Sequence, residues 1–195
     1  MRIPLARVPT MGELFTVDQY VQRQAFSEYS IEGETFQAPS CPFRLLETPP
    51  LYGGDAANLG ADNQSWDTGS LSAKDSLDTS RCASKRGGDS SIPQGPLEGI
   101  TIVDLSMGWA GPLATRNLAD LGATIIKVES CTRFDWFRSW EASQEWIDNN
   151  GAEKEVRFIN LNRNKLDVTL DFESKVGRDL LLRLVAKADA VIENY

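Results

Sequence analysis

Between Ile100 and Glu129 the residues predict a strand, a helix and a second strand, an order that restricts the fold more than any other feature. Ile100–Leu105 is a short apolar run rich in β-branched residues, which predicts a buried strand. A helix is predicted from Pro112, which suits a first helical turn, to Gly122, which suits a helix end. Ala123–Glu129 predicts the second strand. This order implies parallel strands joined by a right-handed crossover.

The residues that follow extend the same pattern. Val156–Leu161 and Leu166–Leu170 read as further short strands, and a long helix is predicted to start near Glu173. Ala188–Glu193 predicts a last strand. The predicted fold class is therefore α/β: an open Rossmann-like parallel sheet with helices, of which the chain holds a part.

Ligands of open α/β sheets bind beyond the carboxyl ends of the strands. In this chain those ends are Ser106–Gly111, Glu129–Arg133 and Asn194–Tyr195. The first turn lacks the G-x-G-x-x-G sequence, so the fingerprint of a dinucleotide site is missing. NAD and FAD are therefore disfavoured, whereas another nucleotide-bearing ligand is favoured.

Composition divides the chain into three segments, 1–66, 67–95 and 96–195. The middle one holds seven serines, four glycines and no aromatic residue, and its four Asp balance its four Lys and Arg. Such a stretch buries too little apolar surface to offset the entropy lost on ordering, which favours a flexible, disordered linker. The alternative is a long surface loop inside one domain, but structureless loops of that length are uncommon. The segment before the linker is expected to be irregular.

Charge and composition exclude several classes of protein. The net charge is −8 with no basic run, which argues against nucleic acid as a partner. No run of eighteen apolar residues and no signal-peptide core is present, so membrane insertion and secretion are unsupported. The complete lack of histidine excludes Ser-His and Cys-His nucleophile systems and most zinc sites, so no metal is expected.

Cysteine usage points to the compartment. Cys41, Cys82 and Cys131 are widely spaced and odd in number, and no C-x-x-C occurs. They read as free thiols in a reducing environment. We therefore expect an intracellular protein, cytoplasmic in the first place, with mitochondrial and peroxisomal locations left open.

Two long stretches carry a family resemblance. They are PLEGITIVDLSMGWAGPLATRNLADLGATIIKVE from Pro96 and FINLNRNKLDVTLDFESKVGRDLLLRLVAKADAVIENY from Phe158. Together they resemble the amino-terminal region of the class III CoA-transferases, a family that includes carnitine and formyl-CoA transferases and α-methylacyl-CoA racemases. The most specific elements are A-G-P after the first strand, L-G-A-x-x-I-K-V-E, N-x-N-K before V-T-L-D, and V-I-E-N-Y.

The first sixty-odd residues resemble the closing segment of the same family more loosely. The matching phrases are Pro-containing, among them Val8–Leu14, Cys41–Leu45 and Thr48–Pro50. The chain thus looks like the tail of one CoA-transferase unit joined to the head of a second. Because relatives form interlocked dimers, the resemblance implies a homodimer, or a tandem protein that builds the pair within one chain.

The resemblance also implies chemistry. Family members move CoA between an acyl-CoA thioester and a carboxylic acid through an aspartyl anhydride and thioester, which requires an oriented carboxylate and an oxyanion site. The family's nucleophilic aspartate lies beyond the position that matches Tyr195, so no catalytic residue is assigned and the isolated chain is expected to be inactive. Two alternatives stay open: a racemase relative that uses an acid/base pair, and a non-catalytic remnant that binds CoA or pairs with a complete subunit.

Binding residues are carried over only where a motif matches. Trp109 and Ala110 follow the first strand where relatives contact CoA, commonly through a glutamine at the Trp109 position. The L-N-x-N-K loop lies against the nucleotide end of CoA in relatives; here it comprises Leu161, Asn162, Arg163, Asn164 and Lys165. Lys165 is the candidate phosphate contact. Asn194 and Tyr195 match an Asn-aromatic pair that packs on CoA.

Each assignment has a structural alternative. Trp109 could simply cover the sheet end, Lys165 could be a solvated loop lysine, and Tyr195 could fray as a chain end. Arg138 matches the last residue of a family G-D-x-x-R phrase in which Phe134 replaces the glycine. A second departure is Ser130, which stands where relatives often carry an arginine. Both departures put the affinity for CoA in question.

Aromatic residues gather between the second strand and Val156. Trp136, Trp140 and Trp146 could line an acyl pocket, but such clusters more often cover a sheet or a partner subunit, and we favour the covering role. Four further residues are assigned to the core or to strand ends: Asp104, Leu105, Ile125 and Val191.

Overall fold

The computed structural model describes residues 6–31, 34–50, 59–61, 63, 95–130 and 132–194. It divides into two compact units, residues 1–44 and 45–195, which we treat separately. The predicted linker 67–95 lies outside the described residues except for Gly95. Cys82, Cys131 and Tyr195 also lie outside them, while Cys41 is buried.

The first unit contains regular elements although its sequence reads as irregular. These are helices α1 (Met11–Leu14) and α2 (Asp18–Gln22) and the antiparallel strands β1 (Phe26–Ile31) and β2 (Glu34–Pro39). A capping box between Thr10 and Glu13 starts α1. The ring of Phe15 packs edge-on against that of Phe26 with 4.7 Å between ring centroids, which ties the helices to the hairpin.

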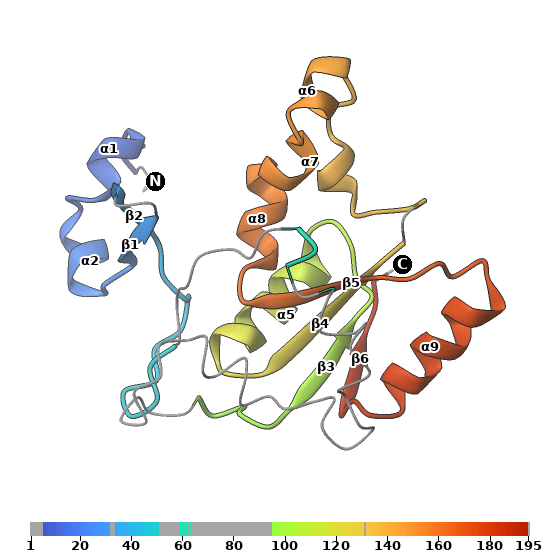
Figure 1. The fold of residues 1–195 in the computed structure, drawn as a ribbon. Coiled ribbons are helices and arrows are strands. Elements are labelled where there is room, and N and C mark those ends of the chain that lie inside the picture. Colours follow the sequence, from blue (N-terminus) through green and yellow to red (C-terminus); the bar gives the residue numbers. More distant parts are fainter. Residues whose placement is uncertain are drawn as a thin grey trace, which may run out of the picture. The chain divides into compact units, whose positions relative to one another are not determined.

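The second unit is built on a four-stranded parallel sheet (Figure 1). Its strands are β3 (Thr101–Asp104), β4 (Thr124–Glu129), β5 (Lys165–Thr169) and β6 (Ala190–Ile192). The order across the sheet is β5-β4-β3-β6, and every neighbouring pair is parallel. The predicted α/β class and the strand–helix–strand unit around β3 and β4 are therefore confirmed.

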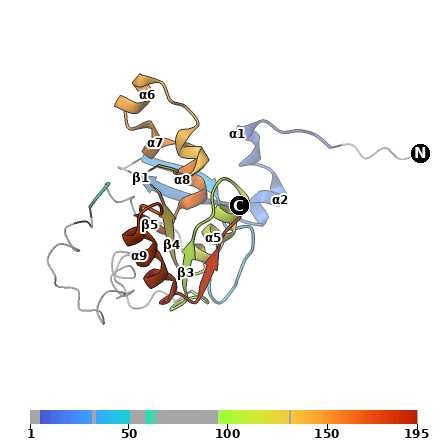
Figure 2. The ribbon, with the colours of Figure 1, turned by 90° about the vertical axis from the view of Figure 1, so that its right-hand side faces the viewer.

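The helices in the described part of this unit lie between the strands. Between β3 and β4 runs α5 (Ala110–Asp120), and between β5 and β6 runs α9 (Lys175–Val185). The segment between β4 and β5 holds four short helices: the 3-10 helix η1 (Trp136–Ser139), α6 (Gln144–Asp148), α7 (Gly151–Lys154) and α8 (Val156–Asn162). The side view in Figure 2 shows α5 and α9 on opposite sides of the sheet.

Alternate residues of the strands build two different layers. On the α9 side Val103, Ile126 and Val128 are buried and pack with Leu181, Leu184 and Val185 of α9, as the sequence predicted, in a wholly apolar layer. On the α5 side Ile102 and Ile125 pack with Ala119 and Ala123. This second layer is apolar only toward the amino ends of the strands, because charged residues follow toward the carboxyl ends.

Two predictions about individual segments were wrong. Val156–Leu161 is helical, not extended: Glu155 caps the start of α8, and the buried Phe158 and Leu161 are three residues apart, as one helix face requires. Val191, assigned to the core or to a strand end, is 42% exposed, because β6 is an edge strand among the described strands. Asp104, Leu105 and Ile125 lie at the core or strand end as expected.

Within the described ranges, no helix combines the length and the apolar character that crossing a membrane requires.

Gly177 offers a test of the packing of α9. A Cβ atom at this position would lie 1.8 Å from the carbonyl oxygen of Asp171, so α9 can approach the preceding loop only with glycine here. We expect Gly177→Ala to lower the free energy of unfolding by about 1–3 kcal/mol, the usual cost of overpacking. Urea denaturation followed by tryptophan fluorescence measures this. Gly12→Ala, in α1 with open space around it, is the control and should cause no loss.

Candidate functional site

Charged side chains replace the apolar layer where the strands approach their carboxyl ends on the α5 side. Asp104 lies opposite Lys127 in the β3–β4 register, and Lys127 lies opposite Asp167 in the β4–β5 register. Glu129 continues the same side of β4. Since ions are costly to bury, each of these side chains needs a partner of opposite charge.

Asp104 and Lys165 form the innermost ion pair. Lys165 Nζ lies 3.0 Å from Asp104 Oδ2, and the two side chains are 1% and 0% exposed. The ammonium also donates to Pro112 O at 3.1 Å and to Asn162 Oδ1 at 2.7 Å. All three of its protons therefore have partners inside the protein.

Ionisation of this pair follows from its surroundings. Burial alone would raise the pKa of Asp104, but the Lys165 ammonium and hydrogen bonds from Ser106 and Thr115 outweigh it and hold the pKa below its ordinary value. Burial lowers the pKa of Lys165 to about 8, against the attraction of Asp104. The pair joins β3, α5 and the turn before β5.

A second buried ion pair connects β4 to the loop after it. Lys127 Nζ lies 3.2 Å from Asp135 Oδ2, with the side chains 2% and 1% exposed. Lys127 also donates to Ser106 O at 2.9 Å. The Asp135 carboxylate accepts from the backbone N–H of Gly108, at 3.2 Å to Oδ2, and from that of Phe137, at 3.1 Å. This pair thus holds the loops after β3 and β4 together.

Arg138 is anchored among three carboxylates. Its guanidinium donates to Glu129 at 2.7 Å, to Glu153 at 2.8 Å and to Asp167 at 3.1 Å, and it stacks on the ring of Phe158 at 3.6 Å from the centroid. Burial would lower the pKa of Arg138, but the three carboxylates raise it. Its predicted contact with CoA stays a prediction, because in this conformation the guanidinium faces protein carboxylates.

Glu129 and Asp167 share a proton between them. Burial and the neighbouring Glu129 carboxylate raise the pKa of Asp167 to about 7. For Glu129 burial acts in the same direction, but hydrogen bonds from Asp167 and from the Asp135 backbone, together with Arg138, keep its pKa below the ordinary value. Near neutrality Asp167 is therefore the partner that carries the proton.

The open rim of the sheet is the loop between β3 and α5. Trp109, just before α5, is 60% exposed and meets the ring of Phe137 edge-on at 5.8 Å. Ala110 is exposed beside it. No side chain caps the first turn of α5, so the positive end of the helix dipole is open toward the rim. This corner combines an aromatic surface with an environment that suits an anion.

Asn194, at the end of β6, fixes this loop from the other side. Its side-chain oxygen accepts from Met107 N at 3.0 Å, and its side-chain nitrogen donates to Met107 O at 3.0 Å. A Cβ atom at Gly111 would lie 2.2 Å from Ser106 Cβ and 3.2 Å from Asn194 Cγ, so α5 starts in close contact with both. The loop that carries Trp109 and Ala110 is therefore held against Asn194, and the predicted contact of these residues with CoA stays a prediction.

The turn Leu161–Lys165 lies elsewhere. Arg163 and Asn164 donate to Asp120 at 2.6 Å and 2.8 Å, and Leu161 is buried. Asp120 ends α5, ten residues after Ala110, which is about 15 Å along a helix axis. Of the ten predicted site residues, Trp109, Ala110 and Asn194 lie at the start of α5. The turn Leu161–Lys165 contacts both ends of that helix, because Arg163 and Asn164 bind Asp120 while the Lys165 ammonium reaches Pro112 O. Arg138 lies inside the protein, and Tyr195 lies outside the described residues.

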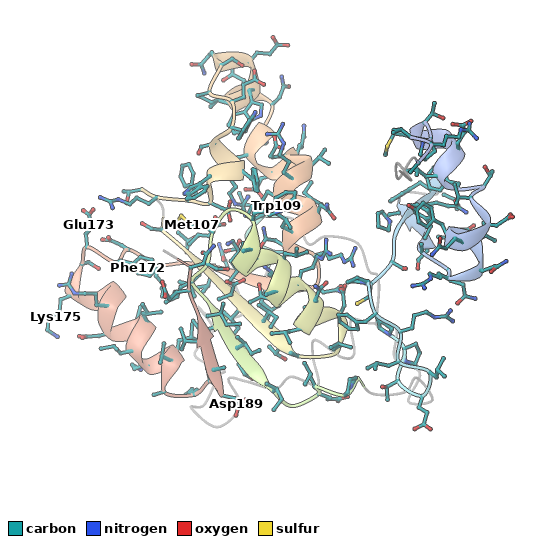
Figure 3. All side chains as sticks on the ribbon, turned by 180° about the vertical axis from the view of Figure 1, so that it is seen from behind. Met107, Trp109, Phe172, Glu173, Lys175 and Asp189 are labelled. Carbon is teal, nitrogen blue, oxygen red and sulfur yellow. The ribbon has the colours of Figure 1, made fainter. Side chains whose placement is uncertain are left out.

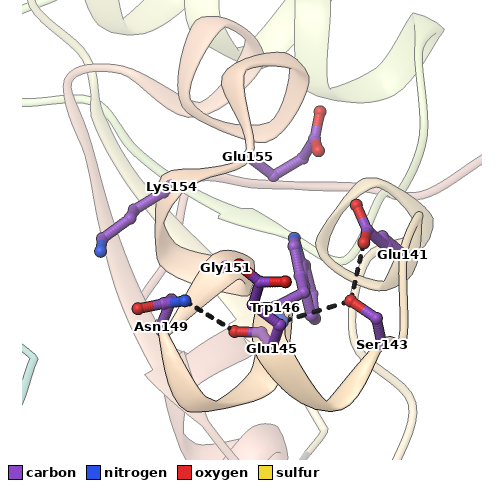
Figure 4. Close-up of a pocket in the computed structure, with 8 residues that line it drawn as sticks. All are labelled: Glu141, Ser143, Glu145, Trp146, Asn149, Gly151, Lys154 and Glu155. Atoms are coloured by element: carbon purple, nitrogen blue, oxygen red, sulfur yellow. Dashed lines mark hydrogen bonds between the residues drawn. The ribbon is translucent and has the colours of Figure 1, made fainter.

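The three tryptophans between β4 and α8 also lie in different places. Trp136 packs over Gly108, where an added Cβ would lie 3.0 Å from its ring, and Trp140 stacks with Arg157 at 4.1 Å. Trp146 instead closes the α6–α7 hairpin, with its ring against Gly151. That hairpin holds an open pocket of about 490 Å³, lined by Glu141, Ser143, Glu145, Trp146, Asn149, Gly151, Lys154 and Glu155 (Figure 4). It lies away from the strand ends, and its acidic lining does not suit an anionic ligand.

Among the described residues, no cluster of three or more Cys, Asp or Glu side chains is arranged to hold a metal ion.

Sequence reasoning missed the residues that shape this rim: Lys127, Glu129, Asp135 and Asp167. A signal was present, because Lys127 and Glu129 alternate with Ile and Val in a strand that parallel pairing buries on both faces. A charge in such a strand has no solvent to face and must be paired within the protein. The identity of the partners depended on the loop after β4, which the sequence did not define.

The shared proton predicts a pH dependence. Because the folded pKa of Asp167 is about 7 against an ordinary 3.8, the folded state binds more protons between these values. Its contribution to stability is full below the unfolded pKa and is lost as the pH rises through about 7. Asp167→Asn, which mimics the protonated acid, should exceed the wild type in stability at about pH 8 and match it at about pH 3, where Asp167 is protonated in both the folded and the unfolded state, as measured by urea denaturation.

Asp179→Asn controls for the loss of a surface charge, since Asp179 is 54% exposed in α9. A constant difference between Asp167→Asn and the wild type at both pH values would contradict the shared proton.

Three known proteins are similar to this chain in sequence. An acyl-CoA transferase of Fusarium pseudograminearum (strain CS3096) is 42% identical over 108 residues, which are 54% of this chain and 24% of that protein. A succinyl-CoA:glutarate CoA-transferase of Mus musculus is 38% identical over 100 residues, 51% of this chain and 22% of that protein. A crystal structure of a CAIB/BAIF family protein from Brucella suis shares 38% identity over 53% of this chain and 26% of its own, with a TM-score of 0.42.

The chain thus spans about a quarter of the length of the relatives it matches. A sequence model of CoA-transferase family III matches residues 97–195, which is half of the chain and includes all four parallel strands. This chain therefore belongs to CoA-transferase family III.

Proposed function

We propose that this chain supplies part of the CoA-binding surface of an enzyme that moves CoA between an acyl-CoA thioester and a carboxylic acid. The observation that carries the proposal is the meeting of Trp109, Ala110 and Asn194 at the carboxyl ends of β3 and β6, within the family match. This is the edge at which open parallel sheets bind ligands. The relative from Mus musculus is named for CoA transfer between succinyl-CoA and glutarate.

The two ends of α5 suit two parts of one elongated ligand. CoA carries a nucleotide with phosphates at one end and a thiol at the other. In our proposal the thiol end lies at the Trp109 rim, and the nucleotide end lies near the turn Leu161–Lys165. Since Lys165 and Arg163 already form ion pairs with Asp104 and Asp120, we assign them to shaping that turn and leave the backbone, Asn162 and Asn164 to meet the ligand.

The strand-end carboxylates do not fit the role of the nucleophile. Asp104, Glu129 and Asp135 are buried and each is bound to a cation, and Asp167 shares a proton with Glu129. A nucleophilic carboxylate has to reach a thioester carbonyl. We therefore propose that the catalytic aspartate is supplied from outside residues 1–195.

The assembly proposal follows from the order of the segments. Residues 1–66 would be the carboxyl-terminal segment of one transferase unit, residues 67–95 a linker, and residues 96–195 the amino-terminal part of the next unit. The complete site would then be built by a tandem chain or by an interlocked homodimer. A racemase relative and a non-catalytic remnant that retains CoA binding are the competing functions.

CoA binding tests the proposal directly. We expect CoA to bind the full chain in isothermal titration calorimetry, and Trp109→Ala to weaken binding about tenfold, because the exposed indole would lose apolar surface buried against the thiol-bearing arm, at about 25 cal/mol per Å². Trp140→Ala is the matched control, since Trp140 is 64% exposed against 60% for Trp109. Equal losses for both variants, or no binding by the wild type, would contradict the assigned surface.

Turnover separates binding from catalysis. We expect the chain alone to give no exchange of CoA between succinyl-CoA and glutarate, because the strand-end carboxylates Asp104, Glu129 and Asp135 are bound to cations within the protein. Mass spectrometry of the thioester pool measures this, with a complete family enzyme as the positive control. Exchange above the uncatalysed rate would place the nucleophile within the chain and overturn the assignment to an outside aspartate.

A further inference from the structure

Side chains from other strand ends hold the backbone of the loop between β3 and α5. Four successive polar groups of this loop are bonded in this way. Lys127 donates to Ser106 O, Asn194 binds both Met107 N and Met107 O, and Asp135 accepts from Gly108 N. The loop that carries Trp109 therefore does not set its own conformation.

Asp135 is the most connected of these side chains. Its two oxygens, 1% exposed, accept from the N–H groups of Gly108 and Phe137 and from the Lys127 ammonium. Its own backbone N–H donates to Glu129 Oε1 at 2.9 Å, which fixes Asp135 relative to β4. A carboxylate can accept from all of these donors at once, whereas a neutral amide offers only one oxygen.

Gly108 is also held from a second side, by the ring of Trp136. Gly108 has a φ of +73°, a conformation that residues with a side chain rarely adopt. Trp136, the residue after Asp135, lies on its open side, where an added Cβ would meet the ring at 3.0 Å. Asp135 and Trp136 thus hold Gly108 by a hydrogen bond and by a packed ring, and Gly108 directly precedes Trp109.

We propose that Asp135 is a positioning residue for CoA binding: it holds the loop after β3 so that Trp109 and the start of α5 face the ligand. This role rests on the proposed function. Asp135 touches no ligand itself, because it is buried beneath the loop. Preorganisation of this kind raises affinity by removing the entropy that a mobile loop would lose on binding.

Asp135→Asn tests the role with little change in size. The amide nitrogen would face one of the present donors, either an N–H group or the Lys127 ammonium, so at least one of these contacts is lost. We expect amide hydrogen exchange to accelerate in peptides that cover residues 105–110 and CoA affinity to fall at least about tenfold. Exchange in peptides from β3 and β4 should stay at the wild-type rate.

Asp189→Asn is the matched control. Asp189 accepts from Thr101 N at 2.8 Å, so it also holds a backbone N–H group by a carboxylate. It lies at the opposite end of the sheet from Met107 and Trp109, as Figure 3 shows. This variant should bind CoA like the wild type and leave exchange at 105–110 unchanged.

The outcomes separate this role from the proposed function. If the wild type binds CoA and Asp135→Asn binds equally well, or if its loop exchanges as slowly as that of the wild type, the positioning role is overturned and the proposed function stands. If the wild type binds no CoA, the proposed function is overturned, and the positioning role falls with it.

Gly108→Ala gives an independent reading if Asp135→Asn does not fold. The added methyl group would meet the Trp136 ring and oppose the positive φ, so it displaces the same loop without removing a buried charge. We expect a loss of CoA affinity of similar size. A folded Gly108→Ala protein with wild-type affinity would overturn the positioning role, because the position of the loop would then not matter for binding.

Discussion

Charge buried inside a parallel sheet is the constraint on which this molecule depends. Helices cover both faces of the sheet, so Lys127 and Glu129 on β4 and Asp104 on β3 have no solvent to face. Removing one partner from such a pair costs about 3–5 kcal/mol, because the other ion is left uncompensated. The partners all come from outside these two strands, which means that pairing the strand charges also places a helix, a turn and a loop. The ion pairs that compensate the buried charges therefore also fix the rim of the sheet.

This arrangement explains how a small parallel sheet can present a defined surface without a rigid loop of its own. The segment that carries Trp109 has a glycine in a left-handed conformation and no cap on the following helix, features that by themselves favour mobility. Its order comes from the ends of β4 and β6. The match to the family III model includes these strands. The chain as a whole covers about a quarter of the length of its relatives. In our proposal this surface is one wall of a site, and the catalytic aspartate belongs to another.

Patterns with one physical meaning were read correctly from the sequence, and patterns with two meanings were not. The strands at β3 and β4 and the glycine end of α5 follow from β-branched runs and from a positive φ at Gly122. Val156–Leu161 failed because a short apolar run fits a strand and a helix equally, and the cap at Glu155 decided for the helix. The meeting of Trp109 with Asn194 was predictable from parallel topology alone. The ion partners were not, since Asp135 and Arg138 lie in a segment whose path no periodicity defines.

The bond between Met107 and Asn194 joins residues 87 positions apart. During synthesis β3, α5 and β4 leave the ribosome long before β6, and they can pair as a local unit because their contacts are close in sequence. Asn194 follows β6, so the loop after β3 gains this contact only after β6 has been made. A nascent or truncated chain that lacks residue 194 would hold a formed sheet with an open rim. Closure of the loop after β3 is in this way coupled to the pairing of β6 with β3.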